Sequence, residues 1–269
     1  MDALQAAVLG LIQGLTEFLP VSSSGHLVLT PWLMGWTDQS LAFDVAVHLG
    51  TLLAVVVYFW RDLWQLLQVT PRILSTDHDP VVGLARGLII ATLPACILGA
   101  LLRVLLDVEF DSPALVATNL MLFGVLLGLA DRYGRRNRQL GDTRWWGYAL
   151  LGLAQAMALI PGTSRSGATM TAGLALGLDR VASARVSFLM AVPIIAIAGA
   201  YEGLKLAKDP ASVEWTAMGV GVSVAFVSGW ICIAGLLKFV ARVGFWPFVA
   251  YRLVLGSVIF GLLAQGALS

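Results

Sequence analysis

The chain has 269 residues, of which 58% are hydrophobic and only 12% are charged, and its mean hydropathy is +0.85. A soluble domain carries charges on roughly a quarter of its residues, so this composition excludes an ordinary soluble protein and predicts a surface that faces lipid. The net charge of +1 comes without a basic patch, and the two cysteines and three histidines lack zinc-type spacing, so neither nucleic-acid binding nor a zinc site is indicated.

The first forty residues contain two short apolar segments, 3–19 and 25–36, which are separated by Pro20-Val-Ser-Ser-Ser24. Neither segment is a convincing membrane crossing, because a helix needs about 20 apolar residues to span a bilayer. We therefore predict a re-entrant helical hairpin over residues 3–36.

Six longer apolar segments follow, each with a length typical of a transmembrane helix. They cover residues 41–60, 82–106, 113–130, 184–204, 216–237 and 248–264. Between the third and the fourth, residues 145–178 again contain two short segments, which we predict to form a second re-entrant hairpin. The expected fold class is an all-α polytopic membrane protein with a single domain over 1–269, about six transmembrane helices and two re-entrant hairpins.

An internal repeat supports this organisation. Two short patterns recur at an offset of 142 residues: Leu-Gly-Leu-x-Gln at 9–13 and 151–155, and Ser-x-Ser-Gly at 22–25 and 164–167. Three predicted crossings separate the two copies, and an odd number of crossings inverts the second copy relative to the first. We expect inverted repeats over about 3–60 and 145–202. Their irregular loops should meet in an enclosed, wet site, since such backbone is tolerated at membrane depth only inside protein or beside water.

The basic residues predict the orientation in the membrane. Residues 132–144 carry five arginines against one aspartate, Asp142, so this segment is expected to be cytoplasmic. It follows that 61–80 lies inside and 107–111 outside, and that the first hairpin enters from the outside and the second from the cytoplasm. Lys238 and Arg242 return to the cytoplasm, which agrees with the same rule.

The first candidate group lies around the end of the first short segment. Gln13 and Glu17 are four residues apart and therefore share one face of a helix. Glu17 is an ionisable group in an apolar segment, where such groups are costly and mark functional sites. The alternative is a carboxylate at the membrane surface, near the end of a short helix.

The run Ser22-Ser23-Ser24-Gly25-His26 precedes the next apolar segment. Serines before a helix are ordinary caps, but three of them with a glycine provide hydroxyl groups, free backbone N–H groups and a helix N-terminus, which together suit an anion. His26 adds a group that exchanges protons near neutral pH. A lone histidine is more often structural, and we expect this of His48 and His78.

The second copy repeats this pattern in Gly162-Thr-Ser-Arg-Ser-Gly-Ala-Thr169, with Arg165 at the position of Ser23. A guanidinium group binds phosphate oxygens in a bidentate manner. The alternative is an arginine that snorkels to the membrane surface. Hydroxyl groups and glycines on both sides favour a phosphate clamp, with binding residues at Ser164, Ser166, Gly167 and Thr169.

These groups suit phosphoryl transfer, in which positioning and charge stabilisation provide most of the catalysis. Ion conduction would require rings of like groups, and an intramembrane serine protease would not need Arg165. A transporter or flippase for a polyprenyl phosphate is the main alternative, because inverted repeats with broken helices are also typical of transporters.

Two segments, Gln13-Gly-Leu-Thr-Glu-Phe-Leu-Pro-Val-Ser-Ser-Ser-Gly-His26 and Pro161-Gly-Thr-Ser-Arg-Ser-Gly-Ala-Thr169, resemble the signature motifs of the undecaprenyl-diphosphate phosphatase family of the bacitracin-resistance type. The flanking segments 43–50 and 188–193 are similar as well. Type 2 phosphatidic acid phosphatases share Ser-Gly-His and Ser-Arg motifs, but the histidine and aspartate that follow there are absent after Arg165.

The resemblance implies hydrolysis of undecaprenyl diphosphate to the monophosphate and inorganic phosphate, which recycles the lipid carrier of cell-wall synthesis and gives bacitracin resistance. It places the chain in the bacterial inner (plasma) membrane, with the active site open to the periplasmic side. The expected partners are the polyprenyl diphosphate, membrane lipid and a second copy of the chain in a homodimer.

The resemblance also implies a divalent cation, Mg²⁺ or Ca²⁺. The family motif begins with glutamate or glutamine, and Gln13 here leaves Glu17 as its one carboxylate, so these two residues are the tentative metal ligands. We expect Arg165 to hold the diphosphate with the backbone of both loops, including residues 22–25. Glu17 binds the cation or acts as a base, and His26 exchanges a proton. The nucleophile is water or a serine, with Ser23 preferred.

Overall fold

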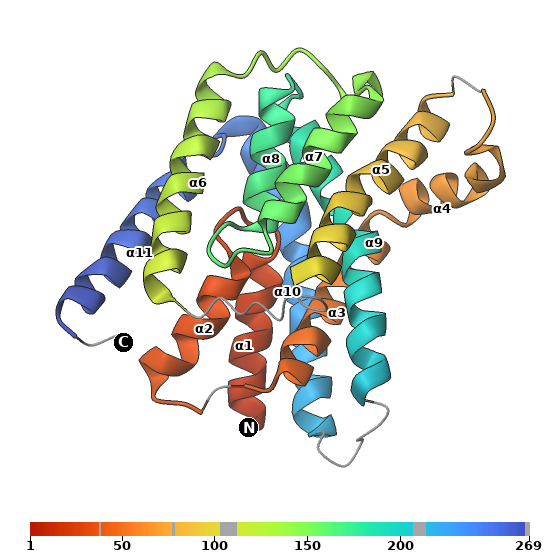
Figure 1. Ribbon diagram of the computed structural model, residues 1–269. Helices are drawn as coiled ribbons and strands as arrows, with labels where there is room; N and C mark the ends of the chain where they lie inside the picture. The colour runs from red at the N-terminus through yellow and green to blue at the C-terminus, as the bar shows by residue number, and fades with distance from the viewer. Residues whose placement is uncertain (38, 77–78, 103–111, 207–213, 267–269) are drawn as a thin grey trace.

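The computed structural model describes residues 1–37, 39–76, 79–102, 112–206 and 214–266, which form a bundle of helices (Figure 1). The helices of this part of the chain are α1 (Ala3–Thr16), α2 (Ser23–Met34), α3 (Leu41–Tyr58), α4 (Trp60–Gln68), α5 (Pro80–Ala100), α6 (Pro113–Tyr133), α7 (Trp145–Met157), α8 (Arg165–Ala175), α9 (Arg180–Leu206), α10 (Trp215–Arg242) and α11 (Trp246–Ala264), with 3-10 turns η1 (Thr70–Arg72) and η3 (Leu140–Asp142). The all-α fold class is therefore confirmed.

Six of these helices, α3, α5, α6, α9, α10 and α11, are long and apolar enough to cross a membrane. They coincide with the six predicted spans and differ from them by a few residues at the ends, except that residues 103–106 of the predicted span 82–106 lie outside the described residues. Large hydrophobic side chains on their outer faces remain exposed, among them Ile97 (66%) and Val254 (64%). Such a surface is suited to lipid rather than water. The chain is a multi-pass membrane protein, and the expected outer loop 107–111 lies outside the described residues.

The remaining apolar helices form two hairpins, α1–α2 and α7–α8, that enter the bundle from opposite ends (Figure 1). Their helices have 14, 12, 13 and 11 residues, and each is too short to cross a bilayer of about 30 Å. The two connecting loops meet near the middle of the bundle. We call residues 17–24, the loop before α2 together with the first two residues of that helix, the first tip. Residues 158–165, the loop before α8 together with its first residue, are the second tip.

Glycines of the repeated pattern hold the first helix of each hairpin against a long span. A Cβ atom on Gly10 of α1 would lie 2.5 Å from the carbonyl oxygen of Gly221 in α10, and one on Gly152 of α7 would lie 2.7 Å from that of Ala91 in α5. Small residues allow helix backbones to approach closely in membranes. The same glycine thus has the same packing role in both copies, which supports the predicted repeat.

Helix α4 is not among the elements predicted from the sequence. The chain bends at Phe59, and α4 then presents Trp60 and Trp64, each 57% exposed, on an amphipathic helix. Tryptophan is enriched where membrane meets water. Helix α4 therefore has the character of an interfacial helix at the end of the bundle that is predicted to be cytoplasmic.

Candidate functional site

The two tips have the same local structure at corresponding repeat positions. Ser22 and Ser164 precede α2 and α8 with positive φ angles of 74° and 69°, which are rare for residues other than glycine. The hydroxyl group of each serine lies near that of the serine two positions later, at 3.2 Å from Ser24 and 3.3 Å from Ser166. Backbone strain of this kind concentrates at functional sites. It directs the first turns of both helices toward the same region.

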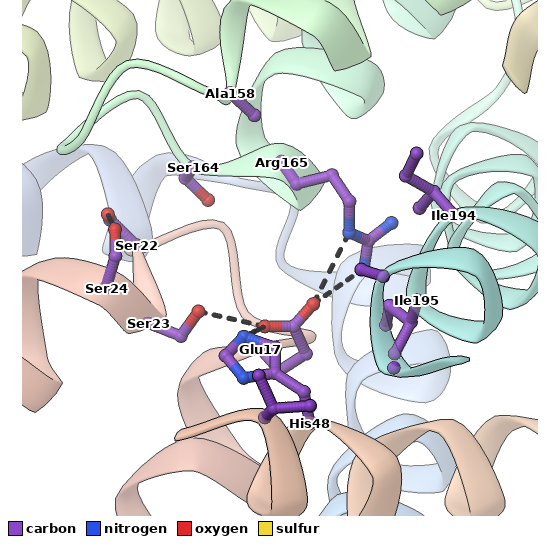
Figure 2. Close-up of a pocket in the computed structure, with 13 residues that line it drawn as sticks. Glu17, Ser22, Ser23, Ser24, His48, Ala158, Ser164, Arg165, Ile194 and Ile195 are labelled. Carbon is purple, nitrogen blue, oxygen red and sulfur yellow. Dashed lines mark hydrogen bonds and ion pairs between the residues drawn. The ribbon is translucent and has the colours of Figure 1, made fainter. Parts of the chain in front are cut away.

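Glu17 connects the two tips. Its side chain is 6% exposed, and its Oε1 atom accepts hydrogen bonds from Nε and Nη2 of Arg165 at 3.3 and 3.2 Å (Figure 2). Its Oε2 atom accepts hydrogen bonds from the Ser23 hydroxyl at 2.8 Å and from the Gln13 amide at 3.1 Å. The predicted juxtaposition of Glu17 with Arg165 is present, and Gln13 acts on the carboxylate from one helical turn away.

Arg165 is the first residue of α8, and its guanidinium group is held in place from two directions. Besides its bonds to Glu17, it donates from Nη1 to the carbonyl oxygen of Ser187 in α9 at 2.8 Å. The hydroxyl group of Thr169 is directed away from the cavity. It donates its one proton either to Arg165 O or to the Ser187 hydroxyl, each at 2.7 Å. Ser166 likewise donates to Leu19 O at 3.0 Å and thereby joins the tips.

A cavity of about 310 Å³ lies between the tips and the helices α3 and α9. Its polar wall consists of Glu17, Ser22, Ser23, Ser24, His48, Ser164 and Arg165, and its apolar wall of Val45, Ala158, Ile194, Ile195, Ala198 and Gly199. Of the predicted phosphate-binding residues, Ser22, Ser24 and Ser164 line this cavity, as does Ser23, the preferred nucleophile. Gly25, Ser166, Gly167 and Thr169 lie behind it and shape the start of α2 and α8.

The cavity combines positive groups with an apolar wall. Helices α2 and α8 both begin at its edge, and the first N–H groups of a helix attract anions. In α8 the N–H of Gly167 is already bonded to Ser164 Oγ at 3.1 Å, and Ser166 is buried outside the cavity lining. Of the first three residues of α8, only Arg165 therefore places its backbone N–H in a residue that lines the cavity. With the Arg165 guanidinium group, the site can bind a phosphate headgroup beside an apolar chain.

His26 is placed differently from what its motif suggests. Its Nδ1 atom lies 2.7 Å from Ser22 O, and its Nε2 atom lies 2.5 Å from the hydroxyl group of Tyr251 in α11. The ring therefore supports the backbone of the first tip and lies outside the set of cavity-lining residues. Its predicted exchange of a proton with substrate stays a prediction.

His48, which was expected to be structural, lies at the cavity. His48 lies in α3, lines the cavity, and places Nε2 3.6 Å from Oε2 of Glu17. Its Nδ1 atom donates to Asp44 O at 2.7 Å, since a carbonyl oxygen can only accept. The ring attracts the carboxylate when Nε2 also carries a proton, which would add a positive charge to the cavity. The signal in the sequence for a place at the site was that His48 is an ionisable residue within an apolar span. His78 lies outside the described residues.

The donor set offers little to a metal ion held by the protein alone. The described residues contain no group of three or more His, Cys, Asp or Glu side chains arranged to hold one. Both oxygens of Glu17 already accept hydrogen bonds, and Gln13 turns its amide nitrogen toward the carboxylate while its Oε1 atom is buried without a partner. Mg²⁺ commonly binds through one or two carboxylates together with substrate phosphates. Only that mode fits these residues.

Comparison with known proteins identifies the family of this chain. Residues 6–258 match the family described as bacitracin resistance protein BacA. An undecaprenyl-diphosphatase of Teredinibacter turnerae is 48% identical over 97% of this chain and 99% of its own. The undecaprenyl-diphosphatase 2 of Stutzerimonas stutzeri is 48% identical over 97% and 98%, and the undecaprenyl-diphosphatase of Marinobacter nauticus is 44% identical over 98% and 100%. The chain thus belongs to the BacA family of bacitracin resistance proteins.

Proposed function

We propose that the protein hydrolyses undecaprenyl diphosphate to undecaprenyl monophosphate and inorganic phosphate. Such a reaction recycles the lipid carrier for cell-wall synthesis and gives bacitracin resistance. The observation that carries this proposal is the meeting of the Arg165 guanidinium group and two helix N-termini in one cavity with an apolar wall. The names of the relatives support the same substrate.

In this proposal Arg165 exchanges part of its contact with Glu17 for the diphosphate oxygens. The first N–H groups of α2 and α8 bind the terminal phosphate, and the wall formed by α3 and α9 holds the first isoprenyl units. His48 adds positive charge when it is doubly protonated. Positioning and charge neutralisation are the main requirements for phosphoryl transfer, and these groups provide both.

Ser23 is the proposed nucleophile, with water as the alternative. Its hydroxyl group lies in the cavity and donates to Glu17 Oε2 at 2.8 Å, a geometry in which the carboxylate can take its proton. The Oγ–P bond forms at the terminal phosphorus while the bond from that phosphorus to the bridging oxygen breaks. Undecaprenyl monophosphate leaves with the bridging oxygen. Water then attacks the phosphoserine, and inorganic phosphate leaves as Ser23 regains its proton.

A divalent cation, Mg²⁺ or Ca²⁺, is proposed to arrive with the diphosphate. Glu17 would contribute one oxygen to it, with Gln13 as the neighbouring polar group, and the cation would neutralise phosphate charge when bound. The absence of a three-ligand cluster among the described residues supports binding through the substrate.

We further propose that the protein lies in the bacterial inner membrane, with both hairpins re-entrant and the cavity open to the periplasmic side. The five arginines of residues 132–144 support this orientation. Cysteine labelling tests it with Ser40→Cys and Asn137→Cys, in a chain without its native cysteines. Both positions are exposed, one directly before α3 and the other in the segment between α6 and α7, and these two segments lie at opposite ends of the bundle (Figure 1). An impermeant reagent should label only position 40 in intact cells, and labelling of position 137 alone would reverse the orientation.

The function is tested with purified protein in detergent, where no sealed compartment exists. Phosphate release from undecaprenyl diphosphate supports the phosphatase, whereas a transporter or flippase would release none. Ser23→Ala should abolish turnover, and acid quenching of wild type with terminally labelled substrate should trap label on the protein. Ser223→Ala, an exposed serine on α10, is the matched control and should retain activity. Full activity of Ser23→Ala would assign the attack to water.

A further inference from the structure

Arg252 lies in the middle of the apolar helix α11, and its side chain is completely buried. All of its hydrogen-bond partners in the described residues are backbone carbonyl oxygens. Nε donates to Leu120 O at 2.9 Å, Nη1 to Pro20 O at 3.2 Å, and Nη2 to Asn119 O, Gly162 O and Thr163 O at 3.2, 2.9 and 3.0 Å. The guanidinium group thus has no carboxylate partner there.

These carbonyl groups belong to three separate parts of the fold. Pro20 is in the first tip, Gly162 and Thr163 are in the second tip, and Asn119 and Leu120 are in α6. One planar group therefore joins both tips to a membrane-spanning helix. Asn119 reinforces the second connection, because its amide donates to Pro161 O at 2.9 Å.

A buried charge without an opposite charge is expensive, and ionisable residues in membrane spans are rare outside functional sites. The same protein shows the ordinary solution elsewhere: buried Asp131 is paired with Arg180 at 2.6 Å. Arg252 instead satisfies its donors with the backbone of the two tips.

We propose that Arg252 is a positioning residue that fixes the two tips relative to each other. It does not line the cavity, so it acts through the tips and not on the substrate. By holding Pro20 and Gly162 from one point, it keeps Glu17 and Ser23 of the first tip in register with Arg165 of the second. The catalytic consequence rests on the proposed phosphatase function, whereas the structural consequence does not.

The fold offers a matched pair of variants in which Arg252 itself is not substituted. Gly124 and Gly128 lie one turn apart on α6 and both face α11. A Cβ atom on Gly124 would lie 3.2 Å from Cβ of Arg252, whereas one on Gly128 would lie 3.4 Å from Val249, at ordinary van der Waals distance. Gly124→Ala should therefore displace Arg252 by a few tenths of an ångström, and Gly128→Ala should leave it unmoved.

The test compares wild type, Arg252→Lys, Gly124→Ala and Gly128→Ala as purified, folded proteins. Hydrogen exchange is measured for peptides that cover 17–24 and 158–167, and phosphate release is measured with undecaprenyl diphosphate. A lysine ammonium group cannot reach both tips and α6 together, so Arg252→Lys should exchange at least about tenfold faster at both tips. Its kcat should fall about 100-fold with little change in KM, the size of effect expected from a misplacement of about 1 Å.

Gly124→Ala should show a smaller loss of kcat, about three- to tenfold, while Gly128→Ala stays within about twofold of wild type. Unchanged tip exchange in folded Arg252→Lys would overturn the proposal. If that variant does not fold, the glycine pair decides, and equal tip exchange in Gly124→Ala and Gly128→Ala would overturn it. Wild type that releases no phosphate would refute the proposed function, and the exchange measurements would still decide the role of Arg252.

Discussion

Replacement of Arg165 by lysine tests the phosphate clamp most directly. The guanidinium group uses Nε and Nη2 toward Glu17 at 3.3 and 3.2 Å, and at the same time Nη1 toward Ser187 O at 2.8 Å. An ammonium group has a single nitrogen and cannot occupy both positions. The lysine variant keeps the charge but loses the planar fork, so it should insert and fold while it binds the diphosphate poorly.

The magnitude follows from the number of bonds that are lost. A hydrogen bond to a charged group contributes about 1.5–3 kcal/mol, and about 1.4 kcal/mol corresponds to a tenfold change in rate. Side-chain exposures of 13% for Arg165 and 6% for Glu17 leave little solvent to screen these interactions. Loss of one to two such bonds to the phosphate groups in the transition state costs about 1.5–6 kcal/mol and predicts a decrease in kcat/KM of at least about tenfold.

The assay is release of inorganic phosphate from undecaprenyl diphosphate in detergent, at equal amounts of folded protein. Arg185→Lys is the matched control, since Arg185 pairs with Asp62 at 2.7 Å, is 42% exposed and does not line the cavity. This control should stay within about twofold of wild type, as expected for an exposed ion pair. Arg165→Lys with kcat/KM within about threefold of wild type would refute the clamp.

Three further predictions concern the wall, the cation and the first tip. Ala198→Trp should raise KM for undecaprenyl diphosphate about tenfold, because overpacking of the apolar wall costs about 1–3 kcal/mol. The control is Ile197→Trp, since Ile197 is exposed and outside the cavity lining. Equal KM values for the two variants would exclude this wall as the site of the lipid chain. Mg²⁺ should leave the Tm of the substrate-free protein unchanged, even though removal of Mg²⁺ by a chelator lowers activity. If the protein alone held the ion, Mg²⁺ at a concentration of 100 times its Kd would add about 2.7 kcal/mol of stability and raise the Tm clearly. Ser22→Gly should be more stable than Ser22→Ala by about 1 kcal/mol in thermal unfolding, because alanine keeps the strain of a φ angle of 74° and glycine removes it; the opposite order would show that the tip is not strained.

The long spans and the two tips were predictable from the sequence because their signals are local. Apolar runs of about 20 residues mark crossings, and the polar run that ends at His26 interrupts that pattern clearly. The repeat added the correspondence of Ser22 with Ser164, which the structure reproduces in their backbone angles. Membership of the motif was a weaker guide to individual side chains. Thr169 was predicted to bind phosphate, but helix geometry turns its hydroxyl group toward Arg165 O, four residues earlier.

Contacts between distant segments were not predictable in this way. His48 reaches Glu17 from another helix, and no spacing rule connects residues 31 positions apart on separate elements. Arg252 carried a usable signal as a charge in an apolar span, yet its partners are backbone carbonyls, which every residue has. Only the folded chain shows that those carbonyls come from both tips.

The apolar wall of the cavity has a consequence for kinetics. It is formed by α3 and α9 and reaches the outside of the bundle at Ala198, which is exposed. A polyprenyl chain dissolved in the bilayer can therefore approach sideways, with its headgroup sliding along the interface, without leaving the lipid phase. Under such conditions turnover follows the mole fraction of substrate among the surrounding amphiphiles. Dilution with inert detergent at constant bulk substrate concentration should slow the enzyme, much as lowering a surface density slows a two-dimensional reaction.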